Sequence, residues 1–318
     1  MAELPELKLT PTIDAIYQLY VDEPNDWRRD HLGGSQIGKE CERALWYDFR
    51  WCTAPNFDGR MLRLFKTGNR EEKRILDELA RLKLEIYVCD HRNGKQIHYD
   101  DFGGHFGLNL DAMARGFKEA PKTWHVVECK TMNTANFARF KKSGVMVSHF
   151  KYWAQMQAYM AYSKKDRAFF IAVCKDTDEL WEERVYFDPN FAKKLRARAE
   201  QAIFGEKPSF QISDNDNHPE CKWCDHKGVC RGKECAEITC RTCFWAKPTR
   251  EGGWACEERP NMSSSDQRHP CALHLLMPCL VPMETSNIDI ENGTISYGAV
   301  INGPGHTASE NLWKELFG

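Results

Sequence analysis

The spacing of apolar and polar positions along the chain predicts helices and strands in alternating order. From Met61 to Leu84, apolar residues recur at helical spacing with charged residues between them, which predicts a long amphipathic helix. Two strand-like runs follow, at 105–115 and 124–131, and the polar, proline-containing segment between them is typical of a hairpin loop. A helix over 152–163, a strand over 168–174 and a helix over 190–204 are expected next. This order predicts an α/β body with a mixed sheet.

The character of the chain changes after Pro208. Nine of the fourteen cysteines fall within residues 221–279, among short segments rich in glycine, proline and tryptophan. Segments this short bury little apolar surface, and regions of this kind usually depend on a bound metal for stability. The sequence therefore predicts a small metal-stabilised region at the C-terminal end.

Composition narrows the class of protein. With 318 residues, 42% hydrophobic and 28% charged, the chain has the content of a soluble globular protein. It lacks both an apolar run of membrane-spanning length and an N-terminal signal pattern, so we expect a cytoplasmic protein without a membrane partner. Fourteen cysteines in a reducing compartment favour metal ligands over disulfides. A net charge of −2 excludes a polycation, so any binding of phosphate must be local.

The second strand-like run ends in the sequence Glu128-Cys129-Lys130. Strand periodicity puts Glu128 and Lys130 on one face and the Cys129 side chain on the other. A carboxylate there can hold a divalent cation, and the ammonium can steady a water or a phosphate beside it. Asp111 ends the preceding run, and a hairpin would bring it beside Glu128. The alternative is a salt bridge between Glu128 and Lys130 that serves only the sheet.

Related elements appear upstream and downstream of this trio. In chain order they are Gly68-x-x-x-Glu72, Asp111, Glu128-x-Lys130 and Gln155-x-x-x-Tyr159. The set resembles the PD-(D/E)XK nuclease superfamily, and specifically its RecB-like branch. The resemblance implies a restriction-endonuclease-like fold, with a mixed central sheet flanked by helices. No proline precedes Asp111, which departs from the motif that names the superfamily but removes no ligand.

The resemblance also implies roles for these residues. The implied catalytic set is Asp111, Glu128, Lys130, Glu72, Gln155 and Tyr159. The implied ligands of Mg²⁺ or Mn²⁺ are Asp111, Glu128, the backbone carbonyl of Cys129 and Glu72, with Glu71 as the substitute for Glu72. Lys130 would orient the attacking water or help to deprotonate it, and would stabilise the developing charge.

A first group of cysteines follows the pattern Cys221-x-x-Cys224-x₅-Cys230, which offers three thiolates on one tight loop. With Cys41 far upstream, the pattern resembles the iron–sulfur nucleases of the RecB-like branch, such as AddB-type nuclease domains and CRISPR adaptation exonucleases. The resemblance implies a [4Fe-4S] cluster on these four cysteines, joining the two ends of the fold. Two alternatives stay open: zinc in the same four positions, or Cys41 as a buried core thiol.

A second group, Cys240, Cys243, Cys256 and Cys271, has the two-plus-two character of a zinc ribbon, and tetrahedral Zn²⁺ suits it best. His274 could replace Cys271. These groups divide the chain into an expected nuclease domain over 1–236, closed by the cluster, and a small zinc-ribbon-like domain over 237–318.

The expected function is a divalent-metal-dependent DNA exonuclease that hydrolyses phosphodiester bonds in DNA processing, recombination or phage DNA metabolism. DNA is the expected substrate, and a helicase or recombination protein the expected partner. The alternative is a non-catalytic iron–sulfur module that binds DNA or serves as the adaptor of a helicase–nuclease machine. Candidate phosphate contacts are Lys141, Lys142, Lys151 and the basic helix 193–198, with Phe140, Phe150, Tyr152 and Trp153 as candidate base-stacking residues.

Overall fold

The largest sheet in the described part of the chain, called the central sheet below, is mixed and has five strands. The computed structural model describes residues 10–24, 27–298 and 300–303. The strand order is β2-β5-β6-β7-β8, with β6 and β7 parallel and the other neighbours antiparallel. Its strands are β2 (Glu85–Tyr87), β5 (Ala112–Arg115), β6 (His125–Met132), β7 (Arg167–Cys174) and β8 (Leu180–Tyr186).

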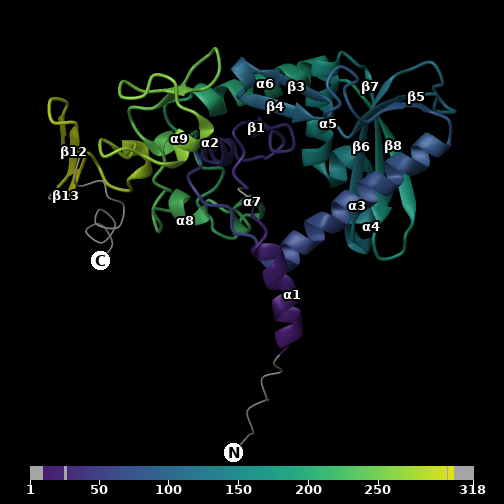
Figure 1. Cartoon of the computed structure of the whole chain (residues 1–318), viewed down its shortest axis with the longest axis horizontal. Helices are drawn as coiled ribbons and strands as arrows, with labels where there is room; N and C mark the ends of the chain where they lie inside the picture. Colours follow the sequence, from purple (N-terminus) through teal and green to yellow (C-terminus); the bar gives the residue numbers. More distant parts are fainter. Residues whose placement is uncertain (1–9, 25–26, 299, 304–318) are drawn as a thin grey trace, which may run out of the picture.

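Helices cover both faces of this sheet (Figure 1). The long helix α3 (Gly59–Arg81) crosses one face, where its Ile75 and Leu79 pack into a core with alternate residues of β5, β6 and β7. The helices α4 (Thr134–Ser148) and α5 (Phe150–Ser163) contact the opposite face. The predicted class, an α/β fold with a mixed central sheet flanked by helices, is therefore confirmed.

A second, smaller sheet lies beside the first. It contains β1 (Leu32–Gly33), β4 (Phe106–Asn109) and β3 (His98–Asp101), and the 3-10 turn η1 (Phe102–Gly104) joins β3 to β4. The predicted single strand over 105–115 is wrong, because the chain leaves this sheet after Asn109 and enters the central sheet at Ala112. Asp111 thus sits at the junction between two sheets.

Most of the predicted elements lie within two or three residues of their expected bounds. The helix expected over 61–84 is α3, that over 152–163 is α5, that over 190–204 is α6 (Pro189–Phe204), and the strand over 168–174 is β7. Four elements were not predicted from the sequence: α1 (Pro11–Val21), α2 (Glu42–Arg50), α4 and β8. No helix in the described part of the chain has the length and apolar character needed to cross a membrane.

Beyond α6 the chain forms short elements connected by turns. They are α7 (Pro219–Lys222), α8 (Lys227–Cys230), η2 (Cys240–Thr242), β9 (Lys247–Pro248), β10 (Trp254–Ala255), α9 (Ser264–Arg268), η3 (Pro278–Leu280), β11 (Asn287–Asp289), β12 (Thr294–Tyr297) and β13 (Val300–Asn302). The last three strands form an antiparallel sheet at the far left end of the molecule in Figure 1.

Residues from this C-terminal part complete the core of the N-terminal part. Arg241 is buried, its guanidinium carbon lies 3.7 Å from the centre of a Trp51 ring, and it donates hydrogen bonds to the carbonyl of Phe49 at 2.9 Å. Trp254 is also buried and stacks on Phe49 with ring centres 5.5 Å apart. The division at 236/237 stays a prediction, and apolar cores combine residues from both sides of it.

Candidate active site

The antiparallel pairing of β5 with β6 brings Asp111 to Glu128. Ala112 pairs with Val127, so Asp111 precedes β5 at the position next to Glu128. One carboxylate oxygen of Asp111, Oδ2, accepts a hydrogen bond from the backbone N–H of Cys129 at 2.9 Å. The ammonium of Lys130 forms a close ion pair with Oε1 of Glu128 and donates to the Cys129 carbonyl at 3.2 Å. The structure thus assembles the three residues that the sequence singled out.

Alternation along β6 separates these side chains as expected. The Cys129 thiol is buried in the core beneath α3, together with Val127 and Phe169. Lys130 lies toward α5, where its Nζ is 5.2 Å from the centre of the Tyr152 ring. The thiol is therefore directed away from the ion pair, while the Cys129 carbonyl lies beside it.

The Glu128 carboxylate is completely buried, and only one of its two oxygens has a hydrogen-bond partner among the described residues. Its exposed fraction is 0%, and among the described residues its second oxygen, Oε2, has no hydrogen-bond partner. Burial, and then the negative charge of Asp111, raise the pKa of Glu128 to about 8. Burial opposes the charged form of Lys130, but the carboxylates of Glu128 and Asp111 outweigh it and raise the pKa of the ammonium. An unpartnered, buried carboxylate oxygen in such a field marks a position suited to a cation.

Glu72 on α3 adds a third carboxylate to this field. It is half-buried, and burial followed by the charge of Asp111 raises its pKa. Its neighbour Glu71 instead forms an ion pair with Arg74 at 3.4 Å. Of the two, Glu72 is therefore the carboxylate whose pKa is raised by the charge of Asp111.

The possible metal ligands of this site are side-chain carboxylates and a backbone carbonyl. Across the described ranges, no three histidine, cysteine, aspartate or glutamate side chains converge closely enough to hold a metal ion. Asp111 accepts a hydrogen bond from the Cys129 N–H, and Lys130 contacts both the Glu128 carboxylate and the Cys129 carbonyl, so two carboxylates and one carbonyl are grouped around these residues. Two carboxylates and a carbonyl are hard oxygen donors, which Mg²⁺ and Mn²⁺ prefer.

Gln155 and Tyr159 lie behind the trio rather than at its surface. Both are buried, and Gln155 Nε2 donates a hydrogen bond to the Tyr159 hydroxyl at 2.8 Å. Burial, and then the nearby charge of Glu128, raise the pKa of Tyr159. Gly34 lies against the ring, since a Cβ at that position would come within 2.7 Å of it. The predicted catalytic roles of this pair stay predictions. The observed hydrogen bond shows two buried residues that contact each other behind the trio.

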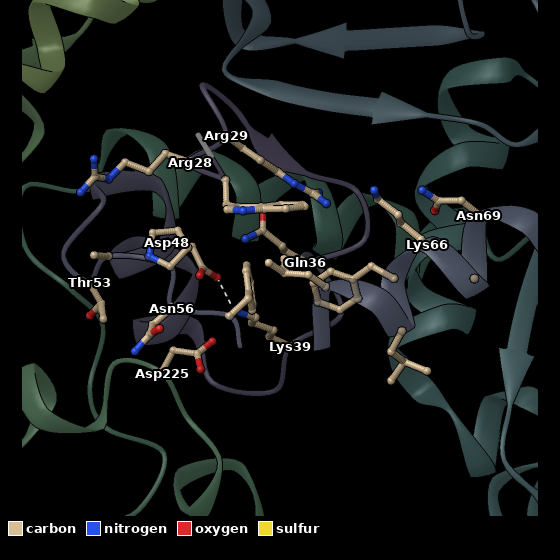
Figure 2. A pocket seen from close by; sticks show the side chains of 18 of the residues that line it. Arg28, Arg29, Gln36, Lys39, Asp48, Thr53, Asn56, Lys66, Asn69 and Asp225 are labelled. Atoms are coloured by element: carbon tan, nitrogen blue, oxygen red, sulfur yellow. Dashed lines mark hydrogen bonds and ion pairs between the residues drawn. The ribbon is translucent and has the colours of Figure 1, made fainter. Parts of the chain in front are cut away.

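A large cleft reaches Lys130 of the trio, whereas Asp111 and Glu128 are not among its lining residues. Its volume is about 1370 Å³, and its lining includes Glu72, Cys129 and Lys130. Figure 2 shows Lys66 and Asn69 of α3 on one side of the cleft and Thr53 and Asp225 on the other. No sequence pattern indicated most of the lining residues, which include the cations Arg28, Arg29, Lys39, Lys66 and Lys175 and the aromatic residues Trp27, Phe57 and Phe65.

The basic residues expected to contact phosphate are mostly engaged elsewhere. Lys141 forms an ion pair with Glu179, and Lys151 pairs with Glu220 at 3.4 Å. On α6, Arg196 pairs with Asp101 at 2.7 Å.

Two of the expected base-stacking residues are part of the core. The exposed fraction is 0% for Phe140 and 8% for Trp153, so the expectation that they stack on bases is wrong. They lie on the inward faces of α4 and α5, which pack against the sheet. Tyr152 does line the cleft.

A buried polar network connects the cleft to the cysteine-rich loop. His226, in that loop, is 4% exposed, and its Nε2 lies 3.0 Å from Oδ1 of Asp48 on α2. Its Nδ1 lies 3.0 Å from the Thr53 hydroxyl. Lys39 donates to the other oxygen of Asp48 at 2.5 Å (Figure 2). Sequence spacing gave no sign of this network, because its members are up to 187 residues apart.

Three cysteines of the first group are electrostatic neighbours. Cys41 caps the start of α2, while α8 ends at Cys230. Burial is the main cause that raises the pKa of Cys224, and the charges of Cys41 and Cys230 raise it further. Cys221 is half-buried, with its thiol 3.9 Å from the Ser213 carbonyl. The fold therefore brings residue 41 to the loop of residues near 224.

The cysteines of the second group influence one another through their charges. Burial raises the pKa of Cys240 to about 11, and the charges of Cys243, Cys271 and Cys256 add to this effect. The backbone N–H of Leu275 donates to the Cys243 sulfur at 3.5 Å.

His274, the alternative ligand to Cys271, is buried near the second cysteine group. Its Nε2 lies 3.0 Å from the Thr239 carbonyl, and Nδ1 is buried with no partner among the described residues. Burial lowers its pKa to about 4, so the ring is neutral near pH 7. A neutral imidazole is the form that binds a metal.

No protein-family profile matches the chain, and no curated protein sequence matches it. Among solved structures, LHK-Exo in complex with dAMP has 16% identity and a TM-score of 0.41, over 55% of this chain and 87% of that one. The alkaline exonuclease LHK-Exo from Laribacter hongkongensis has 15% identity and a TM-score of 0.38, over 55% of this chain and 87% of that one. The protein SSO0001 has 12% identity and a TM-score of 0.39, over 69% of this chain and 94% of that one. At these TM-scores the likenesses assign no function.

Proposed function

We propose that this protein is a divalent-metal-dependent DNA nuclease whose active centre is Asp111, Glu128 and Lys130. The observation that carries the proposal is the fully buried Glu128 carboxylate, whose Oε2 has no partner among the described residues while Asp111 adds negative charge beside it. A salt bridge that served only the sheet would not need a second acidic group or an unsatisfied oxygen. A cation-binding site needs both.

The residues present fit Mg²⁺ or Mn²⁺. Asp111, Glu128 and the Cys129 carbonyl would hold the ion, with Glu72 as a further ligand or as a ligand of its water. When bound, the ion supplies positive charge that polarises a phosphodiester and lowers the pKa of a coordinated water.

The protein groups around this position have separate tasks. The Cys129 N–H orients the Asp111 carboxylate by donating a hydrogen bond to its Oδ2 at 2.9 Å. Lys130 lines the cleft as a charged ammonium, so it can donate a hydrogen bond to an attacking water or a phosphate oxygen. Glu72 also lines the cleft, and its raised pKa suits the transient acceptance of a proton.

The exonuclease mode and the partners are finer parts of the same proposal. They rest on the motif order from Gly68 to Tyr159, which resembles RecB-like nucleases. In this proposal the chain shortens DNA from an end during DNA processing, recombination or phage DNA metabolism, and works with a helicase or a recombination protein.

The test is cleavage of end-labelled single-stranded and double-stranded DNA with Mg²⁺ or Mn²⁺. We expect Lys130→Ala to lower the rate by at least about a hundredfold, the usual scale for a lost proton-transfer or charge-stabilising group. Lys141→Ala is the matched control, because that lysine pairs with Glu179 outside the cleft. Full activity of folded Lys130→Ala would refute the assignment. DNA binding without cleavage by the unaltered protein would favour the adaptor alternative.

We further propose that Cys41, Cys221, Cys224 and Cys230 bind a [4Fe-4S] cluster. Support comes from the mutual charge effects of Cys41, Cys224 and Cys230, which a cation bound among them would reverse. A cluster there would connect α2 to α8 and close a very long loop. Anaerobic purification should yield iron and inorganic sulfide, both lost in Cys224→Ser, whereas zinc alone would indicate the alternative metal.

For Zn²⁺, we propose Cys240, Cys243, Cys256 and Cys271 as ligands. The N–H of Leu275 already donates to the Cys243 sulfur, an interaction that favours a thiolate. Metal analysis should find one zinc that Cys243→Ser removes. Loss of zinc in His274→Ala but not in Cys271→Ser would instead assign the fourth position to the histidine.

A further inference from the structure

One face of α3 forms a wall of the cleft and leads to the active centre. Phe65, Gly68, Asn69 and Glu72 all line the cleft, at the three- and four-residue spacing that puts side chains on one helical face. At 1.5 Å of rise per residue, Phe65 and Glu72 are about 10 Å apart along the helix axis. That length matches about three nucleotides at 3.4 Å each.

Gly68 leaves an open space in this wall. It lies in the interior of α3, where glycine weakens a helix relative to alanine. A Cβ at this position would meet nothing within 4 Å, so no contact within the described protein requires glycine. What the missing side chain provides is room in the cleft, one helical turn before Glu72.

Aromatic rings stand at the far end of this row. Trp27 packs edge-on against Phe57 and Phe65, with ring centres 5.6 and 6.1 Å away. Although they pack on one another, Trp27 and Phe65 remain 41% and 38% exposed, and both line the cleft. Exposed rings on a concave surface are suited to stacking with flat, apolar faces such as those of nucleobases.

Two cations in the cleft have no acidic partner among the described residues. Lys39 pairs with Asp48 at 2.5 Å and Lys66 with Glu23 at 2.5 Å. In contrast, Arg29 and Lys175 line the cleft and form no ion pair with any described residue. Among the described residues, the Arg29 side chain donates only to the Ser35 hydroxyl, at 3.0 Å, which leaves most of its guanidinium donors available.

We propose that the cleft binds one unpaired DNA strand of a few nucleotides. Its sugar–phosphate backbone crosses α3 at Gly68, its bases stack on Trp27 and Phe65, and Arg29 and Lys175 contact its phosphates. Duplex DNA does not fit this description, because its base faces are already stacked and cannot reach the rings. The inference rests on the proposed function in one respect: Glu72 and Lys130 then receive the strand.

Binding of fluorescein-labelled oligothymidylate, measured by anisotropy in a Lys130→Ala background, tests the aromatic part. We expect Trp27→Ala and Phe65→Ala each to raise Kd about tenfold. Trp27→Phe, which keeps a ring, should bind nearly as the parent does. Trp181→Ala is the matched control, since Trp181 is 43% exposed but lies outside the cleft. Equal affinities for Trp27→Ala and Trp181→Ala would overturn the proposal, as would tighter binding of a blunt duplex than of the single strand.

The open space at Gly68 gives a test that separates binding from folding. Gly68→Leu should weaken binding of the oligonucleotide at least tenfold while Tm stays the same or rises, because the added side chain enters the cleft and favours the helix. Gly68→Ala should raise Tm with a smaller effect on Kd. Unchanged Kd in Gly68→Leu would contradict the proposed path of the strand.

The cations predict a salt effect. Two lost phosphate contacts should reduce the slope of log Kd against log salt by about 1.4 for a single strand. The variant carrying Arg29→Ala and Lys175→Ala should show this reduction. A variant carrying Lys118→Ala and Lys122→Ala, two exposed lysines outside the cleft, should not. Equal slopes in both variants would exclude Arg29 and Lys175 as phosphate contacts.

Hydrolysis of bis(p-nitrophenyl) phosphate, a diester too small to span the cleft, separates this inference from the proposed function. In the otherwise unaltered enzyme, Trp27→Ala should slow cleavage of the oligonucleotide and leave the small diester unaffected. Ring-dependent binding without hydrolysis of either substrate would sustain the strand-binding cleft and reject the nuclease. Hydrolysis of both substrates at unchanged rates in Trp27→Ala would sustain the nuclease and reject the strand-binding cleft.

Discussion

His226 Nε2 and Asp48 Oδ1 are 3.0 Å apart in a buried contact that joins the cysteine-rich loop to α2. The two residues come from opposite parts of the sequence, and both line the cleft. Their contact therefore connects the shape of the proposed strand-binding cleft to the position of the loop that carries Cys221, Cys224 and Cys230.

This contact predicts a loss of stability at acidic pH. Burial alone would raise the pKa of Asp48, but the hydrogen bond with His226 and the charge of Lys39 outweigh it and lower the pKa. A lowered folded-state pKa adds stability above the unfolded value of 3.8, and that stability is lost as pH falls through the folded value. Asp48→Asn should thus lower the free energy of unfolding by about 1.5–3 kcal/mol at pH 7, as measured by urea titration.

The penalty of Asp48→Asn should shrink at pH values below 3.8. Asp178→Asn serves as the control, because Asp178 pairs with Arg74 on the surface and is 61% exposed. An Asp48→Asn penalty that is constant from pH 7 to pH 3 would contradict the assignment of charge to this carboxylate.

The buried carboxylate of Glu128 predicts the opposite pH dependence for the metal-free protein. Its folded pKa of about 8 lies above the ordinary value of 4.5. The stability that its protonated form provides is therefore complete below pH 4.5 and is lost as pH rises toward 8. Thermal melts in chelated buffer should show unfolding free energy falling by up to about 1.4 kcal/mol per pH unit across this window.

Mg²⁺ or Mn²⁺ should reverse this trend, since the ion binds the ionised carboxylates. We expect the rise in Tm on adding the ion to be larger at pH 8 than at pH 5. Glu128→Gln should flatten the pH dependence and remove most of the metal effect. A variant that keeps the full slope would show that another group titrates.

Gly103 in η1 and Gly252 in the turn between β9 and β10 approach each other closely. A Cβ on Gly103 would lie 2.2 Å from the Gly252 nitrogen, and one on Gly252 would lie 2.3 Å from the Gly103 carbonyl oxygen. Gly103→Ala should therefore lower the free energy of unfolding by about 1–3 kcal/mol from overpacking, in addition to the strain of its positive φ. Gly94→Ala isolates that strain, because Gly94 has a similar φ, +68° against +66°, and open space around it. Equal penalties at 94 and 103 in urea titrations would contradict the close approach.

The hydrogen bonds of Arg241 join the C-terminal part of the chain to the N-terminal part, and their loss should weaken this attachment. Its guanidinium donates to the carbonyls of Phe49 and Asp30, at 2.9 Å each, and to Gln267 at 2.7 Å. Arg241→Lys cannot form this planar set of bonds and should destabilise the protein by about 3 kcal/mol. Proteolysis should then cut sooner near residue 237. Arg250→Lys, at a surface arginine paired with Glu200, should leave both unchanged.

The local part of the site could be predicted from the sequence. Alternation in β6 fixes the opposite directions of Glu128 and Cys129, and the hairpin places Asp111 beside them. Helical periodicity likewise gives α3 and α5. These features depend on residues within one element or one hairpin, so short-range patterns carry them.

The cleft could not be predicted in the same way. Trp27, Arg29, Phe65 and Lys175 meet only after the chain has folded, and no local pattern relates them. Conversely, the aromatic residues beside Lys141 and Lys151 suggested a stacking platform, but tertiary packing buries Phe140 and Trp153. The strand expected over 105–115 was divided for a similar reason, since alternation does not reveal a change of partner sheet.

The stacking of Trp254 on Phe49 has a consequence for the order of events during synthesis. Phe49 and Trp51 emerge from the ribosome some two hundred residues before Arg241 and Trp254, which cover them. Until that later segment arrives, the growing chain must keep these rings exposed or covered by a chaperone. A premature stop before residue 241 would therefore leave an open apolar surface, and the partial product should be prone to aggregate rather than act on DNA.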